Sequence, residues 1–342
     1  MSQIDPHAFS IDQLGPYLEA HIPGFKNLFK AEKFAGGQSN PTFLLEADSG
    51  KYVLRRKPPG ELLKSAHAVD REFRVISALA QTDVPVAAAR HLCEDDSVIG
   101  SMFYVMDFVP GRVLWDAMLP ELDNAARGEI YDEMNRVMVA LHSVDIDAVG
   151  LQDFGRPGNY YERQVSRWTK QYRASETDRI DAMEQLIAWL GERVPPDDGR
   201  VSLVHGDYRL DNIMFHASHN TAAAVLDWEL STIGHPFADL AYQCMQWRLP
   251  SSGMALSGFG DTDRNALGIP SEEQYVARYC ERMGIDGIED WNFYLAVSFF
   301  RLAAIVQGVY KRGLDGNASS DRAKLYGEAA RQVAKAALSV LS

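Results

Sequence analysis

The stretch HGDYRLDNIMF, which runs from His205 to Phe215, and the segment VLDWE, which ends at Glu229, decide the fold of this chain. Four residues separate Asp207 from Asn212, and Asp227 follows in the second segment. Phosphoryl transfer from ATP asks for little covalent chemistry, so catalysis consists of positioning and charge neutralisation. One carboxylate must face the attacking hydroxyl, while an amide and a second carboxylate hold the Mg²⁺ ion that bridges the phosphates. These three side chains supply that set.

The segment between Asn212 and Asp227 predicts a short β-hairpin. Residues 213–215 and 222–226 are apolar, and the mostly polar residues 216–221 separate them as a turn. Such a hairpin would return Asp227 to a position beside Asn212.

The spacing of Asp207 and Asn212 matches the protein-kinase signature, in which four residues also lie between the catalytic Asp and the metal-binding Asn. Gly206 stands in place of the usual arginine. The alternative is that both residues are ordinary turn residues, since Asp and Asn favour turns. HGD alone would leave this open, whereas the whole arrangement with the hairpin is much more specific.

Size and charge narrow the class of protein. The 342 residues, 46% hydrophobic and 24% charged, suit one large two-lobed domain or two compact ones. A net charge of −13 argues against nucleic-acid and anionic-membrane partners, which favour basic surfaces. The start MSQIDPHAFS lacks the regions of a signal peptide, and we expect no apolar run long enough to span a bilayer. Cys93, Cys244 and Cys280 form no CxxC pair and predict reduced, mostly buried side chains in a cytoplasmic protein.

Periodicity and turn residues predict an α+β fold with two lobes. The N-lobe, residues 1–108, should contain helices over 10–21 and 66–80 and strands at 33–35, 42–47, 52–56, 90–94 and 102–108. The C-lobe, residues 109–342, should carry the catalytic loop, the hairpin and helices over 123–144, 160–174, 178–192, 236–247, 271–283, 290–312 and 320–341. A Gly/Ser-rich stretch between Leu249 and Pro270 resembles a mobile loop or lid.

Six segments resemble functional segments of the aminoglycoside phosphotransferase and choline kinase family, small-molecule kinases with the bilobal protein-kinase fold. They occur in the family's order over roughly residues 30–310: GGQSNPTF, YVLRRKPPG, DREFRVISAL, MDFVPG, HGDYRLDN and LDWE. The run LDWELSTIGHPFADLAY is most similar to the kinase domain fused to some acyl-CoA dehydrogenases. No dehydrogenase domain occurs in these residues, so the resemblance implies a free-standing relative.

The resemblance implies an ATP- and Mg²⁺-dependent kinase that phosphorylates a hydroxyl group of a small molecule. Asp207 would be the base that orients and deprotonates this hydroxyl, and Asn212 and Asp227 would be the magnesium ligands. His205 would brace the catalytic loop. Asp239, in PFADLAY, would be a structural acceptor for the same loop.

The expected phosphate loop consists of Gly36, Gly37, Gln38, Ser39 and Asn40. Adjacent glycines let backbone N–H groups approach phosphates closely, and Ser39 adds a hydroxyl donor. A plain β-turn would use the same residues. The position between two strands, upstream of a basic strand and an acidic helix, favours nucleotide binding.

Arg55 takes the strand position of the kinase lysine that contacts the α- and β-phosphates. Val53 and Arg55 share one face of the strand, whereas Arg56 should point the other way. Arginine can clamp a phosphate bidentately, although it departs from the family pattern, and Lys57 is the reserve candidate. Glu72 should pair with the cation; the alternative is a solvated helix carboxylate.

Met106 to Gly111 is the expected hinge, whose backbone would meet the adenine edge through residues including Met106 and Phe108. The alternative for Phe108 is a core position. On the helix at 160–174, Arg163, Arg167 and Lys170 share a face. Such a row is commonly a solvated face. It could instead bind an anionic acceptor such as the phosphates of coenzyme A.

Two other classes of protein remain open. An inactive nucleotide-binding regulatory module would be favoured by loss of any one of Asp207, Asn212 and Asp227, and all three are present. A protein kinase is disfavoured because GxGxxG and an APE segment are absent, which argues against a protein substrate. The acceptor stays open: aminoglycosides and choline would need an acidic pocket, and an acyl-CoA would need a basic one.

Overall fold

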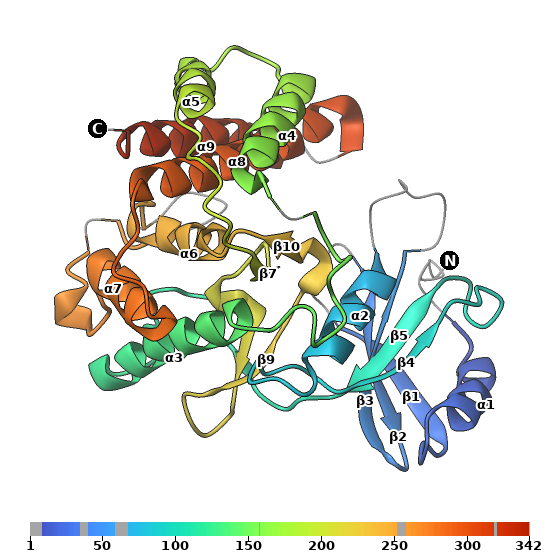
Figure 1. Ribbon diagram of the computed structural model, residues 1–342. Helices are drawn as coiled ribbons and strands as arrows, with labels where there is room; N and C mark the ends of the chain where they lie inside the picture. Colours follow the sequence, from blue (N-terminus) through green and yellow to red (C-terminus); the bar gives the residue numbers. More distant parts are fainter. Residues whose placement is uncertain are drawn as a thin grey trace. The chain divides into compact units, whose positions relative to one another are not determined.

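The computed structural model describes residues 9–34, 40–58, 68–156, 158–251, 258–260, 262–317 and 320–341. The chain divides into two compact units, which are coloured along the sequence in Figure 1. The first unit is Met1–Arg112 with Ala223–Ser231, and the second unit is Val113–Ala222 with Thr232–Ser342.

The first unit is built on a five-stranded antiparallel sheet in the order β1-β2-β3-β5-β4. Its strands are β1 (Leu28–Lys33), β2 (Thr42–Ala47), β3 (Gly50–Arg56), β4 (Ala89–Cys93) and β5 (Phe103–Asp107). Arg55 on β3 lies opposite Tyr104 on β5, and Leu54 lies opposite Val105. Because side chains alternate between the faces of a sheet, Arg55 and Tyr104 share one face and Leu54 and Val105 share the other.

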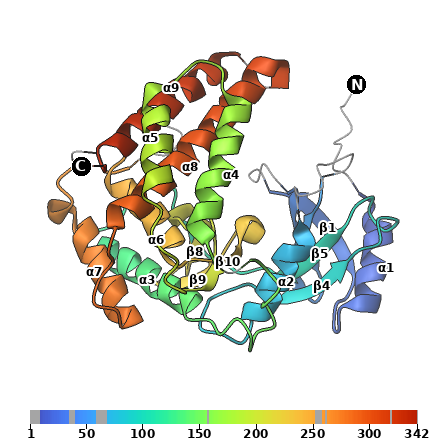
Figure 2. The ribbon, with the colours of Figure 1, turned by 45° about the horizontal axis from the view of Figure 1, so that its top comes forward.

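One helix covers each face of this sheet, as Figures 1 and 2 show. The helix α1 (Ile11–His21) packs apolar side chains against Leu54 and Val105 in the core of the unit. On the opposite face, α2 (Val69–Leu79) places Glu72 beside Arg55. The sheet therefore separates an apolar core from a face that carries charged groups.

The second unit is mainly helical. Its longest helix, α8, packs against α4, α6 and α9 and forms the centre of the unit. The helices are α3 (Asn124–His142), α4 (Tyr160–Ser175), α5 (Asp181–Glu192), α6 (Phe237–Cys244), α7 (Glu272–Met283), α8 (Trp291–Arg312) and α9 (Ser320–Leu338). Shorter turns of helix occur at Leu210–Asn212, Met245–Trp247, Asn265–Leu267 and Gly313–Asn317.

Short strands hold the catalytic loop in this unit. The strand β7 (Ser202–Val204) precedes the loop and pairs with β10 (Thr232–Gly234) in an antiparallel ladder. The predicted hairpin corresponds to β8 (Ile213–Phe215) and β9 (Ala222–Val225), although β9 belongs to the first unit from Ala223 on. Its turn is closed by the N–H of His216, which donates to the Thr221 carbonyl. A two-residue strand, β6 (Arg112–Val113), lies where the first unit gives way to the second.

The division between the units differs from the predicted one at two places. The first unit extends to Arg112 rather than to residue 108, and it also includes Ala223–Ser231, which was assigned to the C-lobe. The reason lies in contacts distant in sequence: the N–H of Val225 donates to the Pro85 carbonyl at 2.8 Å, and Arg71 donates to the Ser231 carbonyl at 3.4 Å.

Most predicted elements are present with shifted ends. The strand expected at 33–35 is Leu28–Lys33, and the helix expected at 66–80 begins at Val69. The strands β7 and β10, each of three residues, were not predicted because such short segments carry no readable alternation. Residues 252–257 and 261 of the expected loop between Leu249 and Pro270 lie outside the described residues, and the described part contains the helical turn Asn265–Leu267. All three cysteines are free and buried, as predicted.

The expectation that no segment could span a membrane was wrong by length and composition. The segment Trp291–Asp315 is long and apolar enough, with a mean hydropathy of 1.5 in its most apolar window. Within this window 72% of the residues are buried inside the protein, as is usual for a core helix. The high hydropathy follows from the central place of α8, which is apolar on nearly all sides.

Candidate active site

The catalytic loop follows β7, and Asp239 on α6 holds its backbone. This fully buried carboxylate accepts the backbone N–H groups of His205 and Gly206 at 2.6 and 2.8 Å and contacts His142 Nε2 at 3.3 Å. Burial by itself would raise the pKa of Asp239, but the hydrogen bond with His142 and the contacts with His205 hold that pKa below its ordinary value. These contacts are those of the structural acceptor that was predicted.

Gly206 explains why the loop lacks the arginine that protein kinases have at this place. Its φ is +83°, in the left-handed region that favours glycine. Its N–H is held by Asp239, and its carbonyl accepts Nη2 of Arg301 on α8. Both backbone polar groups of Gly206, the residue before Asp207, are therefore fixed. His205 is fully buried, and its Nδ1 accepts the N–H of Asp207 at 3.2 Å.

Asp207 and Asn212 lie together, as the sequence predicted. The Asn212 amide donates to the carbonyl of Asp207 at 2.9 Å and to its Oδ2 at 3.0 Å. Arg209 Nε lies 3.4 Å from the same Oδ2. The Asp207 side chain is 20% exposed, so it is held firmly but remains open to an acceptor. The Asn212 amide oxygen makes no hydrogen bond with the described residues and is available as a ligand.

Asp227 belongs to the first unit and lies two residues after the end of β9 at Val225. Its backbone is left-handed, with φ at +61°, which Asp tolerates better than most residues. Oδ1 accepts Nη2 of Arg55 at 2.6 Å, and no hydrogen bond to Oδ2 is formed by the described residues. The side chain is 35% exposed. Whether Asp227 approaches Asn212 stays a prediction, because the two residues belong to different units.

Arg55 and Glu72 form the predicted ion pair, with Arg55 Nε 2.8 Å from Glu72 Oε2. The N–H is not aligned for a hydrogen bond, so the contact is mainly electrostatic. Tyr104 and Asn40 donate to Glu72 at 3.1 and 2.8 Å. Burial raises the pKa of Glu72 to about 7, although Arg55 opposes this shift. A solvated helix carboxylate, the alternative for Glu72, is excluded because this residue is buried.

The reserve candidate Lys57 has a different partner. Its ammonium group lies 3.8 Å from Asp70, while Arg56 points to the other face, where its Nε donates to Ser101 at 2.9 Å. The geometry of the first unit thus favours Arg55 over Lys57 as the cation next to Asp227.

Replacing Arg55 with alanine should raise the Michaelis constant for ATP by about tenfold or more, because a charge-assisted contact contributes about 1.5–3 kcal/mol. Arg55→Lys should recover part of this loss by restoring a positive charge. Lys57→Ala is the matched control and should change the constant by less than about twofold, since this exposed pair contributes little. Steady-state kinetics at saturating acceptor measures these effects, and the reverse ranking of the two alanine variants would contradict the assignment.

The remaining nucleotide-contact predictions have mixed outcomes. Gly36, Gly37 and Ser39 lie outside the described residues. Asn40 is 1% exposed and uses its amide on Glu72, so its observed contact supports the ion pair. Met106 is on β5, and Phe108 follows it, half-buried rather than in the core. The Phe108 N–H donates to the Lys51 carbonyl and is already engaged within the sheet.

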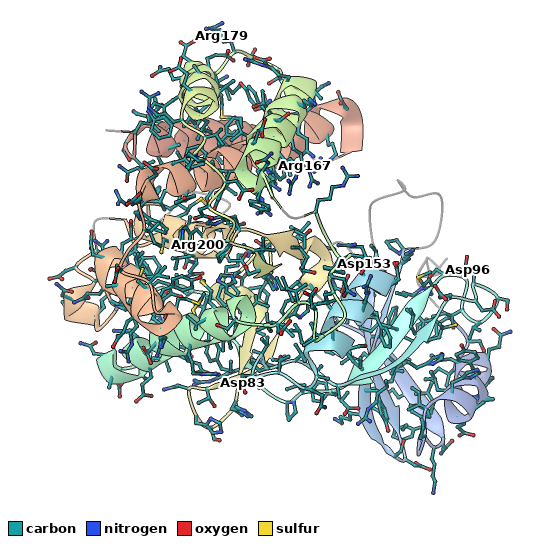
Figure 3. The ribbon with its side chains drawn as sticks, viewed as in Figure 1. Asp83, Asp96, Asp153, Arg167, Arg179 and Arg200 are labelled. Carbon is teal, nitrogen blue, oxygen red and sulfur yellow. The ribbon has the colours of Figure 1, made fainter. Side chains whose placement is uncertain are left out.

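The basic row on α4 separates into two kinds of residue. Arg167 and Lys170 are exposed, and Figure 3 labels Arg167 on this helix. Arg163 donates to the backbone carbonyls of Gly158 and Arg156, so it braces the segment before α4. Binding of the acceptor by any of the three stays a prediction.

A cavity of about 380 Å³ lies in the second unit near the start of α4. Tyr160 and His235 line it, together with Glu162, Asp197 and Asp198. These three carboxylates outnumber the two arginines that also line the cavity, so it does not offer the basic surface that coenzyme A phosphates would need.

Three residues of the site were not predicted from the sequence: Tyr104, Tyr242 and Arg301. Tyr104 is one of several apolar-looking strand residues and gave no signal. Burial and then the nearby Asp207 carboxylate raise the pKa of Tyr242 on α6. Arg301 did carry a signal, because it is the only charged residue between Trp291 and Tyr310.

The chain belongs to the phosphotransferase enzyme family, whose model matches residues 30–275. Among solved structures, a candidate aminoglycoside phosphotransferase from Ralstonia eutropha is 49% identical, with a TM-score of 0.90 and 98% of both chains covered. The predicted α+β fold and the expected relationship to aminoglycoside phosphotransferases are thereby confirmed. A spectinomycin phosphotransferase, solved with ADP and spectinomycin, shares the fold at 15% identity, with a TM-score of 0.63 over 96% of this chain and 98% of that chain.

Curated relatives include two acyl-CoA dehydrogenase family members. Member 10 from Mus musculus is 52% identical over 330 residues, which cover 95% of this chain and 30% of the relative. Member 11 from Homo sapiens is 43% identical over 97% of this chain and 43% of the relative. The chain thus spans less than half the length of these relatives.

Proposed function

We propose that this phosphotransferase moves the γ-phosphate of ATP to a hydroxyl group of a small molecule. The observation that carries the proposal is the fixed geometry of Asp207. Its backbone is held through Gly206 and His205, its carboxylate is held by the Asn212 amide, and a fifth of the side chain stays exposed. A carboxylate in this setting can orient a hydroxyl and accept its proton as the bond to phosphorus forms.

Asn212 and Asp227 would hold Mg²⁺. Each side chain keeps an oxygen that makes no hydrogen bond with the described residues, and Mg²⁺ prefers oxygen ligands. Among these residues no group of three or more His, Cys, Asp or Glu side chains could hold a metal ion alone. This fits an ion that enters with ATP and takes several ligands from phosphates and water. Bound there, Mg²⁺ would neutralise charge that develops on the phosphates.

Arg55 would contact the α- and β-phosphates from the first unit. Its guanidinium is held at two points, by Glu72 and by Asp227, which limits the conformational freedom lost on binding. Donors on an arginine form a planar fork that matches phosphate oxygens. The buried partner Glu72 sets the direction of this fork.

For the acceptor we propose a hydroxyacyl-CoA, with an aminoglycoside or a choline-type alcohol as the alternatives. The proposal draws on the curated relatives, whose names refer to acyl-CoA dehydrogenases. The exposed charges of Arg167 and Lys170 add a physical reason, since coenzyme A carries several phosphate charges. Phosphorylation would prepare the acyl hydroxyl for departure. The buried free cysteines are compatible with a cytoplasmic location, which we also propose.

Hydroxyacyl-CoAs should stimulate ATP turnover, whereas kanamycin-type amino sugars and choline should not. Reversal of charge in Arg167→Glu should raise the Michaelis constant for the acceptor by roughly tenfold, because like charges would then face each other. The constant for ATP should not change. Arg179→Glu is the matched control, since this arginine is 71% exposed and lies beyond the end of α4. Phosphorylation of an amino sugar with hydroxyacyl-CoAs inert would overturn the acceptor and leave the kinase proposal intact.

A further inference from the structure

Arg301 is a charged residue in a place that rarely holds one. It lies in α8, and no other residue between Trp291 and Tyr310 is charged. It is half-buried and forms no ion pair with the described residues. A buried arginine is costly unless a partner compensates its charge, so its presence in the central helix calls for a reason.

Its contacts connect it to Asp207 from two sides. Nη2 donates to the carbonyl of Gly206, the residue before Asp207. The guanidinium carbon lies 5.2 Å from the ring centre of Tyr242, whose pKa is raised by burial and by the nearby Asp207 carboxylate. It also lies 5.5 Å from the ring centre of Trp168 on α4. Arg301 is therefore one residue removed from the proposed base along both paths.

The guanidinium keeps donors that nothing in the described part of the chain satisfies. Only one of its N–H groups makes a hydrogen bond with these residues, and Nε is buried without a partner. An arginine has five N–H donors, and a buried donor left unsatisfied costs about 1–3 kcal/mol. Such a group is commonly explained by a ligand or a water molecule that completes it.

A second unpaired guanidinium shares the same indole. Arg167 lies 5.5 Å from the ring centre of Trp168 and forms no ion pair with the described residues. Burial raises the pKa of Tyr160 to about 12, and the positive charges of Arg301 and Arg167 oppose this shift. The two guanidinium groups thus place positive charge beside one indole ring in a chain with a net charge of −13.

We infer that Arg301 and Arg167, which both lie against the Trp168 ring, form a recognition site for an acceptor that bears a carbonyl or carboxylate oxygen near its hydroxyl group. Arg301 is the residue that determines specificity, because it joins this oxygen to the backbone that positions Asp207. The site fits hydroxy acids and their thioesters, and its charge opposes amino sugars and choline. This inference rests on the proposed function, in which the acceptor hydroxyl lies at Asp207.

A purely structural role for Arg301 would have a different signature. If it only supports the Gly206 carbonyl, its loss should reduce turnover of every acceptor by the same factor. If it also recognises an acceptor oxygen, its loss should be greatest for acceptors that carry that oxygen. Two matched acceptors separate these cases: a hydroxyacyl-CoA and its thioether analogue, which lacks the thioester carbonyl oxygen.

The full chain should be assayed as wild type, Arg301→Gln, Arg301→Lys and the control Arg179→Gln. We expect kcat/KM of the wild type and of the control to be higher for the thioester by about tenfold or more, because one hydrogen bond to a charged group has an effect of this size. Arg301→Gln should remove the preference and leave the Michaelis constant for ATP within about twofold, as uninvolved sites do. Arg301→Lys should keep part of the preference for the thioester. Thermal melting of each variant shows whether it is folded, and Arg301→Lys provides a second test if Arg301→Gln does not fold.

Three results would overturn the inference. The first is that Arg301→Gln lowers kcat/KM equally for both acceptors, and the second is that this variant retains the preference for the thioester. The third is that the wild type has no such preference, which includes a wild type that accepts only amino sugars. Each of these leaves the kinase proposal standing, because ATP is still consumed. Failure of the wild type to consume ATP with acceptors of any class would instead refute the proposed function itself.

Discussion

Replacing Asp207 with asparagine should lower turnover by about 100-fold or more, which is the usual effect of losing a general base. The amide is nearly isosteric and can still accept from Asn212, so the loop that Gly206 and His205 hold should keep its shape. Binding of ATP should therefore be unchanged. Single-turnover kinetics together with calorimetry of ATP binding measures both quantities on the same variant.

Asp211→Asn provides a matched control for this variant. Asp211 is a carboxylate of the same loop, and it pairs with Arg209 at 3.0 Å. Its replacement should leave turnover within a few-fold of wild type. Normal turnover in Asp207→Asn, or an equal loss in both variants, would remove Asp207 from the mechanism.

Replacing Asp227 with asparagine should weaken Mg²⁺-dependent binding of ATP by about 30-fold or more, corresponding to about 2 kcal/mol for the loss of one partner of a charge contact. Asparagine tolerates the left-handed backbone at this position and keeps an oxygen for Arg55, so the fold of the first unit should be preserved. Adenosine, which carries no phosphate and needs no metal, should bind as it does to the wild type. Calorimetry with and without Mg²⁺ tests this difference.

Asp70→Asn is the control for Asp227→Asn, because Asp70 is a carboxylate of the first unit that pairs with Lys57 at 3.8 Å. It should bind ATP normally. If Asp227→Asn weakened ATP and adenosine equally, the role of Asp227 would be to support Arg55 and not to hold a metal.

The catalytic loop was predictable from sequence because its determinants are local. The Asn212 amide reaches back to Asp207 within one short turn, and the hairpin after it has apolar arms around a polar turn. The pairing of Arg55 with Glu72 was also accessible, since strand alternation fixes the face of Arg55. Each of these inferences needed only the spacing of residues in the sequence or the alternation of side chains along a strand.

Other features depend on contacts between distant segments, which no local pattern records. Ala223–Ser231 joins the first unit through Pro85 and Arg71, far earlier in the chain. Tyr104 on β5 donates to Glu72 on α2, and three-residue strands such as β7 depend on the strand with which they pair. The lone charge of Arg301 was visible in the sequence, but its contact with Gly206 required the fold.

The central claim is that this chain transfers a phosphate from ATP to a hydroxyl group of a small molecule. Mass spectrometry of the acceptor after incubation with Mg²⁺, isotopically labelled ATP and a panel of hydroxyacyl-CoAs, amino sugars and choline tests it most directly. The account predicts one class of acceptor that gains the labelled phosphate on its hydroxyl with the wild type, and almost none of this product with Asp207→Asn. Binding of Mg²⁺ and ATP without transfer of label to any acceptor would contradict the account and indicate an inactive nucleotide-binding regulatory module.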